Sequence, residues 1–234
     1  MRHIFKTDST VQIFRLGTTS NDKIEGDKKR KIVQSYTFSK DQYNHVYDGE
    51  KGMKAFYDKA NSNCLDCPMR DFGKCYTHKF NQYVGFLSML KSVINEFGDF
   101  ESLPVYDVTI KRQIIDISKN TYIRFGTYGE PSLHPFALIE AITDVCDNWT
   151  GYTHQWFMHP FLGAYFMAST HNEVMEAKAR EMGYRSFMAV ETPIDKFINC
   201  PASKEGGYKS TCSQCGLCSG TSGKGKKSIF ILNH

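Results

Sequence analysis

Residues 121–145 read TYIRFGTYGEPSLHPFALIEAITDV. The first seven residues are rich in aromatic and β-branched types and predict a β-strand. Residues 133–145 predict a helix, because Leu138, Ile142 and Val145 fall on one helical face. A strand joined to a helix by a short loop is the repeating unit of a parallel sheet with right-handed crossovers, so this stretch decides the fold class.

The same alternation continues toward the end of the chain. Strands are expected at KIVQSYTF (31–38), TGYTHQW (150–156), AYFMAST (164–170), RSFMAV (185–190) and SIFILNH (228–234). A capping box at 170–173 predicts the start of a helix that runs through Met182. Six strands are too few for a closed eight-stranded barrel. The pattern therefore predicts an α/β fold, a partial (βα)6-type barrel with a parallel sheet.

The rest of the chain is less regular. The first sixty residues favour an irregular β-structured N-terminal extension, residues 80–97 predict a helix, and residues 101–120 fit a helix or a strand. Residues 1–199 are expected to form the barrel, its extension and a first cysteine cluster. Residues 200–234 are expected to form a Cys-rich auxiliary metal loop and the final strand.

Composition limits the environment of the protein. The chain has 234 residues, a net charge of +4 and eight cysteines. No N-terminal apolar run resembles a signal peptide, and no apolar stretch reaches the roughly 18 residues that cross a bilayer. We therefore expect a cytoplasmic protein with no membrane partner, in which cysteines bind metal rather than form disulfides.

The first cysteine cluster consists of Cys64, Cys67 and Cys75. A disulfide would leave one of the three thiols over, whereas a metal site uses all of them. Three thiolates suit an iron–sulfur cluster with one open position. They equally suit a zinc ion whose fourth ligand is a histidine such as His78. The sequence leaves both possibilities open.

The second cluster is Cys200, Cys212, Cys215 and Cys218, in the pattern C-x11-C-x2-C-x2-C. The C-x2-C-x2-C spacing and the remote Cys-Pro are similar to a ferredoxin ligand set, which favours a second [4Fe–4S] cluster, with zinc as the alternative. The remaining cysteine, Cys146, lies on an apolar helical face and is expected to be a core residue.

Polar residues stand at the ends of several expected strands, where parallel sheets bind their ligands. The candidates are Gly129 and Glu130 after 121–127, His154 in 150–156, Ser169 in 164–170, and Glu191 after 185–190. We expect these residues to line one binding site. His154 could equally be a core histidine that is satisfied by a backbone carbonyl.

Residues 124–142, with Gly129-Glu130-Pro131 and the later LHP, resemble the "GGEP…LHP…L…I" segment of radical S-adenosylmethionine (SAM) enzymes. In that family, three cysteines after the first strand hold a [4Fe–4S] cluster. The fourth iron chelates SAM, and one electron cleaves SAM to a 5′-deoxyadenosyl radical. Cys64, Cys67 and Cys75 would be that ligand set, in a variant C-x2-C-x7-C spacing. Tyr128 replaces the first of the two usual glycines.

The resemblance also implies roles for the other candidates. Gly129 and Glu130 would hold the amino group of SAM, His154 the SAM carboxylate or the substrate, and Glu191 the ribose hydroxyls; Ser169 would line the cofactor site. An electron donor would be a partner, and the substrate would be unknown. The chain further resembles a group of uncharacterised bacteriophage proteins that carry TGYTHQW-like and CPASKEGG-like segments, which would place it in a host cytoplasm.

A second function of a different class remains open. The chain could be a non-catalytic phage module stabilised by zinc or iron–sulfur clusters that binds nucleic acid or a host partner. This hypothesis gives weight to the lysine-rich runs at 28–31 and 224–227.

Overall fold

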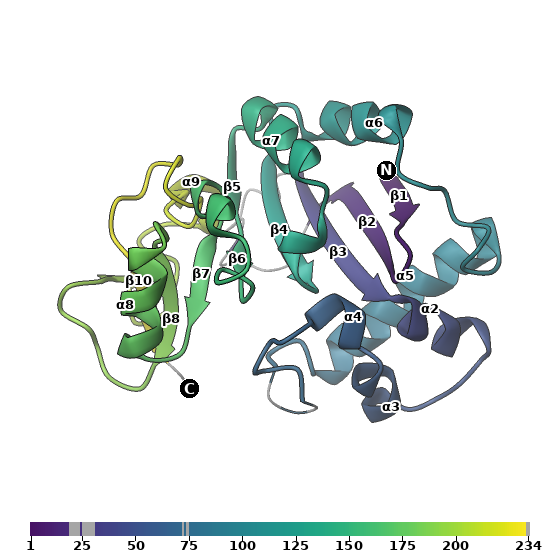
Figure 1. Cartoon of the computed structure of the whole chain (residues 1–234), viewed down its shortest axis with the longest axis horizontal. Coiled ribbons are helices and arrows are strands. Elements are labelled where there is room, and N and C mark those ends of the chain that lie inside the picture. The colour runs from purple at the N-terminus through teal and green to yellow at the C-terminus, as the bar shows by residue number, and fades with distance from the viewer. Residues whose placement is uncertain (19–23, 25–30, 72, 74, 233–234) are drawn as a thin grey trace.

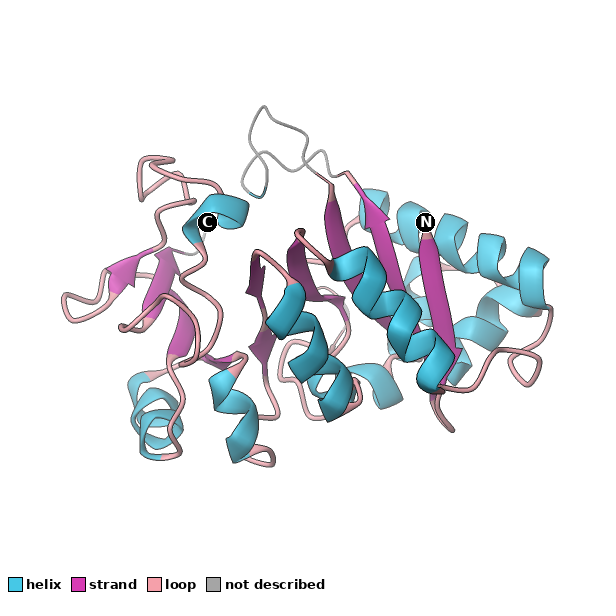
Figure 2. Cartoon of the chain, turned by 90° about the horizontal axis from the view of Figure 1, so that it is seen from above, coloured by secondary structure: helices cyan, strands magenta, loops and turns pink. Residues whose placement is uncertain are grey.

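The structure is a computed structural model of the chain, and it describes residues 1–18, 24, 31–71, 73 and 75–232. Most strands are parallel, and Figure 2 shows them side by side across the width of the molecule. The strands are β1 (Arg2–Lys6), β2 (Thr10–Gly17), β3 (Ile32–Ser39), β4 (Tyr122–Tyr128), β5 (Asn148–Thr150), β6 (Tyr152–Thr153), β7 (Met167–Thr170), β8 (Ser186–Val190), β9 (Ile198–Asn199) and β10 (Ile229–Leu232).

The strands form two sheets, with the orders β1-β2-β3-β4-β5 and β6-β7-β8-β10-β9. Gly151 alone separates β5, which pairs with β4, from β6, which pairs with β7. A Cβ atom at Gly151 would lie 2.4 Å from the Phe166 ring, so only glycine fits at this junction. The predicted α/β fold with parallel strands is therefore confirmed.

Helices cover both faces of the first sheet (Figure 1). They are α2 (Lys40–Tyr47), α3 (Met53–Asp58), α4 (Asn61–Cys64), α5 (Phe80–Phe97), α6 (Val108–Ser118), α7 (Phe136–Val145), α8 (Glu173–Glu181) and α9 (Cys212–Cys215), with 3-10 turns η2 (Pro131–Leu133) and η3 (Pro160–Ala164). Apolar residues of α2, α3 and α5 pack on one face, and those of α6 and α7 pack on the other. None of the helices in the described residues is long and apolar enough to cross a membrane.

The expectation for the first sixty residues is partly wrong. Strands β1, β2 and β3 form a regular antiparallel arrangement, and residues 40–58 are largely helical. The Ser39 side chain accepts from the Gln42 N–H, and the Gln42 carboxamide accepts from the Ser39 N–H, which is a capping box. The basic run at 28–31 lies outside the described residues except for Lys31.

Two other boundaries differ from the sequence expectation. The helix expected over 133–145 begins at Phe136, because Pro131 starts a separate 3-10 turn and Pro135 stands at the helix N-cap. In the helix expected from the capping box at 170–173, Asn172 is the capping residue. Its side chain accepts from the Met175 N–H. Residues 108–118, for which the sequence pattern left helix and strand open, are helical.

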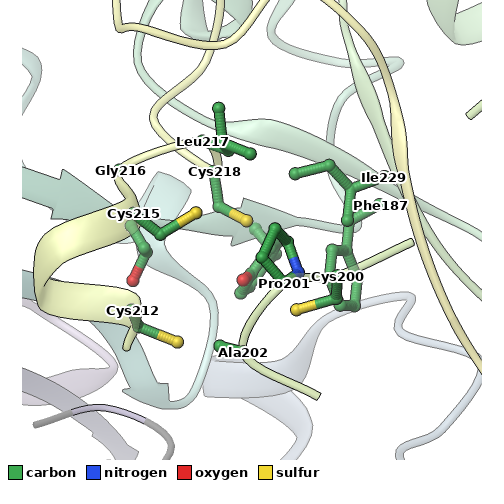
Figure 3. Close-up of a pocket in the computed structure, with 12 residues that line it drawn as sticks. Phe187, Cys200, Pro201, Ala202, Cys212, Cys215, Gly216, Leu217, Cys218 and Ile229 are labelled. Carbon is green, nitrogen blue, oxygen red and sulfur yellow. The ribbon is translucent and has the colours of Figure 1, made fainter. Parts of the chain in front are cut away.

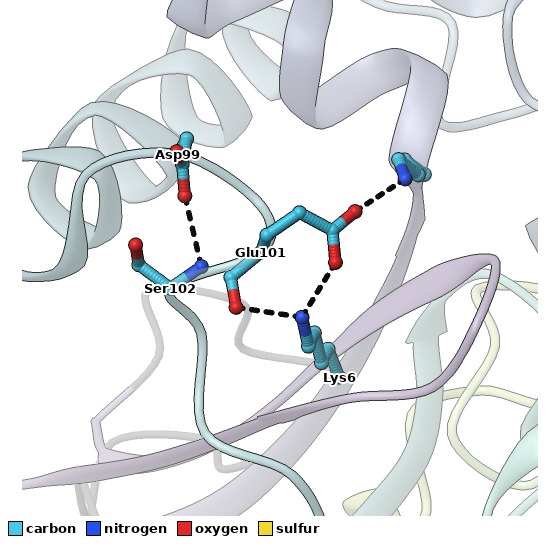
Figure 4. A network of polar contacts seen from close by, with 5 residues as sticks. Lys6, Asp99, Glu101 and Ser102 are labelled. Atoms are coloured by element: carbon cyan, nitrogen blue, oxygen red, sulfur yellow. Dashed lines mark hydrogen bonds and ion pairs between the residues drawn. The ribbon is translucent and has the colours of Figure 1, made fainter.

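The connection after α5 is fastened to β1 at the protein surface (Figure 4). The Glu101 carboxylate accepts a hydrogen bond of 2.9 Å from Lys6, and a second lysine, Lys40, bonds its other oxygen. These two lysines lower the pKa of Glu101 to about 2. Because Glu101 is exposed, this network orders the loop and adds little to stability.

A buried histidine joins η2 to the first sheet. The His134 Nδ1 atom lies 2.6 Å from Gln12 Oε1, and Nε2 lies 2.8 Å from Ser35 Oγ. Gln12 donates through Nε2 to the Leu133 carbonyl, so its Oε1 accepts from a proton on Nδ1. The Ser35 hydroxyl then donates to Nε2. Burial lowers the pKa of His134 to about 3, so the ring is neutral at pH 7.

We expect His134→Asn to destabilise the protein by about 2–4 kcal/mol at pH 7, through the lost hydrogen bonds and packing. The unfolded chain binds a proton on this histidine below pH 6.5, whereas the folded chain stays neutral until about pH 3. The wild type therefore loses up to about 1.4 kcal/mol per pH unit in that window, and the variant does not. Urea unfolding at pH 7 and pH 4.5 measures whether the difference in free energy of unfolding between the wild type and the variant becomes smaller at the lower pH. A difference that stays constant would contradict a His134 ring that is neutral in the folded protein.

Candidate functional site

The carboxyl ends of β3 and β4 meet the first cysteine loop at Asn63. The Asn63 side chain donates to the Thr37 carbonyl at 2.9 Å. The Glu130 N–H donates to the Asn63 carbonyl at 2.7 Å. Gly129 has φ +78°, and a Cβ atom there would lie 2.5 Å from the Thr37 carbonyl oxygen. The Gly-Glu-Pro segment is therefore packed directly against β3 and beside Cys64.

The three thiols of the first cluster lie near one another. Cys64 ends α4, and the Cys67 N–H donates to its carbonyl at 3.0 Å. The Cys75 Sγ atom lies 3.1 Å from the Thr77 hydroxyl. Burial raises the pKa of Cys64, and the nearby Cys67, Cys75 and Glu130 raise it further. Burial is also the main cause that raises the pKa of Cys67 to about 11.

The Glu130 carboxylate is buried and is held by donors from three residues. Ser132 N–H donates to Oε1 at 3.3 Å, and His154 N–H donates to Oε2 at 3.1 Å. The side chains of Thr153 and Ser132 also form hydrogen bonds to the carboxylate. Burial raises the pKa of Glu130, and these hydrogen bonds oppose the rise. The largest contributions to that balance come from burial and from these hydrogen bonds, and none of them comes from a lysine or an arginine.

Of the other predicted residues, His154 joins this site and Glu191 does not. His154 follows β6, and its backbone contacts Glu130 directly. Ser169 lies in β7 opposite Phe187, on the sheet face that carries Met167. Glu191 is exposed one residue beyond β8, and no hydrogen bond or ion pair ties it to the other predicted residues in the described chain.

The sequence did not point to Asn63 or His171. His171 stacks on His154 with ring centroids 5.4 Å apart, and both Nε2 atoms are buried without a partner among the described residues. Burial lowers the pKa of His154 to about 4, with His171 as a second cause. Both histidines follow parallel strands of the second sheet, β6 and β7. That shared position was the one signal that could have paired them.

The second cysteine cluster surrounds a small cavity. Its four sulfur atoms point into the space that they enclose (Figure 3). The cavity of about 30 Å³ is also lined by Tyr152 and Phe187. The Cys218 thiol is buried, and the three other cysteines contribute to its raised pKa after the dominant effect of burial. Tyr152 donates a hydrogen bond to the Cys218 sulfur.

Arg185 holds the loops around this cavity. Its guanidinium donates to the carbonyls of Leu217, Gly220 and Lys227 at 2.7 Å each. A Cβ atom at Gly225 would lie 2.2 Å from the same guanidinium, so the loop is closely packed on it. Arg185 thus joins β8 to both segments that flank Cys218.

Both clusters fit a metal centre by donor chemistry. All eight cysteines are described, and none is in a disulfide. Buried thiols that raise one another's pKa gain most from a cation that replaces their protons. Within the described residues, no three His, Cys, Asp or Glu side chains stand together as a formed metal site. In the first cluster, His78 Nδ1 accepts from the Gly73 N–H, so only its Nε2 could bind zinc.

Gly129→Ala should lower the free energy of unfolding by more than about 2 kcal/mol, for two reasons. The new Cβ overlaps the Thr37 carbonyl oxygen, and an alanine at this position must adopt a positive φ. Gly49→Ala is the matched control: its φ is +74°, and nothing lies within 4 Å of the added Cβ. We expect the control to cost about 1 kcal/mol. If urea unfolding shows that Gly129→Ala and Gly49→Ala lose the same free energy of unfolding, residue 129 is not in close contact with Thr37.

Comparison with known proteins identifies no relative of this chain. No family model, no curated protein and no solved structure matches it. A function therefore has to come from the two thiol clusters, the Glu130 carboxylate and the strands that position them.

Proposed function

We propose that the protein is a radical-SAM-like enzyme, with a [4Fe–4S] cluster on Cys64, Cys67 and Cys75 and SAM beside Glu130. The observation that carries this proposal is the buried Glu130 carboxylate, which lies near Cys64 and Cys67 and forms no ion pair in the described chain. Burying an uncompensated carboxylate is costly. The amino group of SAM would supply the missing positive charge at this position.

The donors around Glu130 set how it would bind an ammonium group. A carboxylate has about four acceptor positions, and the donors of Ser132, Thr153 and His154 take up most of them. The same donors fix the rotamer of the side chain and favour its ionised form. Glu130 therefore positions a ligand through an orientation that the protein sets in advance.

A [4Fe–4S] cluster that carries SAM would supply one electron and thereby cleave SAM to a 5′-deoxyadenosyl radical. The chain would place three cysteines at one edge of the parallel strands and leave one cluster position without a protein ligand. Asn63 would keep the thiol loop and the Gly-Glu-Pro segment in register, through the 2.7 Å bond to Glu130. Buried aromatic residues next to the loop, such as Tyr57 and Tyr128, would help to exclude water.

The fold is compatible with a partial barrel, which we include in the proposal. The parallel pairs run from β3 through β4 and β5, then from β6 through β7, β8 and β10. Gly129, Glu130 and His154 follow strands of this series, and Ser169 lies near the end of β7. Cys200, Cys212, Cys215 and Cys218 would bind an auxiliary [4Fe–4S] cluster or a zinc ion.

One observation favours the alternative, a non-catalytic metal-stabilised module that binds nucleic acid. Residues 195–234 contain six lysines and two acids, so their formal charge of +4 equals that of the whole chain. Each of these lysines is exposed, and Tyr208 is exposed between Lys204 and Lys209. Lysines interleaved with an aromatic ring suit a phosphate backbone and a stacked base. In this alternative both thiol clusters would hold zinc.

Metal and sulfide analysis of anaerobically purified protein separates the two functions. The proposal predicts brown protein with about eight irons, as two cubes require. Cys67→Ala and Cys215→Ala should each remove about half of the iron, and Cys146→Ala should remove none because Cys146 lies outside both clusters. Colourless protein with zinc at both clusters would favour the nucleic-acid module instead.

Incubation with SAM and a strong reductant should release 5′-deoxyadenosine, and Cys67→Ala should abolish the release. Glu130→Gln keeps the shape of the side chain and removes its charge. We expect it to weaken SAM binding at least about tenfold while the iron content stays unchanged. Glu181→Gln, on the exposed face of α8, is the matched control and should bind SAM like the wild type. An iron-loaded wild type that leaves SAM intact would refute the proposed activity.

A further inference from the structure

The guanidinium of Arg124 lies on the sheet face opposite to α6 and α7. Ile123 and Phe125, its neighbours in β4, pack with those helices, so alternation turns Arg124 the other way. Across the sheet Arg124 pairs with Gln34 of β3, which pairs with Arg15 of β2. Paired residues share a face, and this row is therefore a polar band on the sheet face that packs with α2, α3 and α5.

Four phenol groups, those of Tyr36, Tyr76, Tyr122 and Tyr152, interact most strongly with the charge of Arg124. The Arg124 Nη2 atom lies 3.5 Å from the Tyr76 hydroxyl, a marginal hydrogen-bond distance. No carboxylate pairs with Arg124 among the described residues. A guanidinium has five N–H donors, and most of those on Arg124 have no hydrogen-bond acceptor among the described residues.

Arg185 shows what a structural arginine looks like in this protein. Its donors are taken up by the carbonyls of Leu217, Gly220 and Lys227. Arg124 is partly buried as well, yet it has no comparable set of carbonyls. Holding a cation away from water without a partner is unfavourable. The planar set of N–H donors on Arg124 therefore suits ligand binding better than a role in packing.

We propose that Arg124 is the binding site for the oxyanion of a small organic substrate, a carboxylate or a phosphate, with the four tyrosines as its walls. The site rests on the proposed function, because Tyr76 directly follows Cys75 and joins the Arg124 site to the first cysteine cluster. Guanidinium groups bind both oxyanions through two parallel hydrogen bonds. The Tyr36 and Tyr76 hydroxyls can donate to the remaining oxygens, whereas the Tyr122 hydroxyl is bonded to Thr150 and that of Tyr152 to Cys218. None of the four neutralises the cation.

Inorganic phosphate and succinate are the two probes, titrated by calorimetry into anaerobically purified, metal-loaded protein at constant ionic strength. Wild type should bind at least one of them, and the better probe tells phosphate from carboxylate. Arg124→Gln should weaken that binding at least about tenfold, whereas Arg124→Lys, which keeps the charge, should lose less. Arg112→Gln, on the exposed surface of α6, is the matched control and should bind like the wild type.

Binding that is equal in the wild type and Arg124→Gln, or absent for both probes in the wild type, would overturn the assignment. The lysine variant keeps the test decisive if the glutamine variant fails to fold. The outcome is separable from that of the proposed function, because 5′-deoxyadenosine release without substrate should survive in Arg124→Gln. A protein that binds a probe through Arg124 yet leaves SAM intact would retain the anion site and lose the proposed reaction.

Discussion

The hydrogen bond from the Glu130 N–H to the Asn63 carbonyl is the contact on which the arrangement of the first site depends. It connects the short helix α4 with the turn that follows β4, and the Asn63 side chain extends the connection to Thr37 in β3. The approach is possible because Gly129 brings its backbone against the Thr37 carbonyl, where a side chain would not fit. The positions of Cys64 and of the Glu130 carboxylate are thereby coupled through the backbone, whose geometry varies much less than that of side chains.

The two thiol clusters lie at opposite ends of the strands. The first adjoins Glu130, beyond the end of β4, whereas Cys212 packs against Ile32 and Tyr122, where β3 and β4 begin. Figure 1 shows α4 and α9 correspondingly far apart. The seven residues of β4 span roughly 20 Å, which gives the scale of the separation. A cluster at that end is better placed to pin the loops held by Arg185 than to touch a ligand at Glu130.

The sequence predicted the parts of the fold that depend on local periodicity. Strand β4, helix α5 and the strands β7, β8 and β10 follow from alternation and from helical spacing. The strand expected over 150–156 is instead the two short strands β5 and β6, and β9 was not predicted. The helices α2 and α3 were not predicted, because their polar and aromatic-rich sequences show little helical periodicity of apolar residues. Their burial depends on contacts with α5. The coupling of Glu130 to Asn63 could not be predicted, since it joins segments 67 residues apart by backbone atoms. The row of Gln34 and Arg124 depends on strand register, which the sequence does not specify.

Two charged groups of opposite sign lack partners in the described chain, and their positions connect the two proposals. Glu130 stands beyond the end of β4, and Arg124 lies within β4, on the sheet face that packs with α2, α3 and α5. For stability alone, a fold in which these two groups are paired with each other, or replaced by uncharged residues, would have the lower free energy. An unpaired anion beside thiols calls for a cationic ligand, and an unpaired cation among phenols calls for an anionic one. The same strand would then carry both specificities, with Tyr76 and the cysteine loop between them.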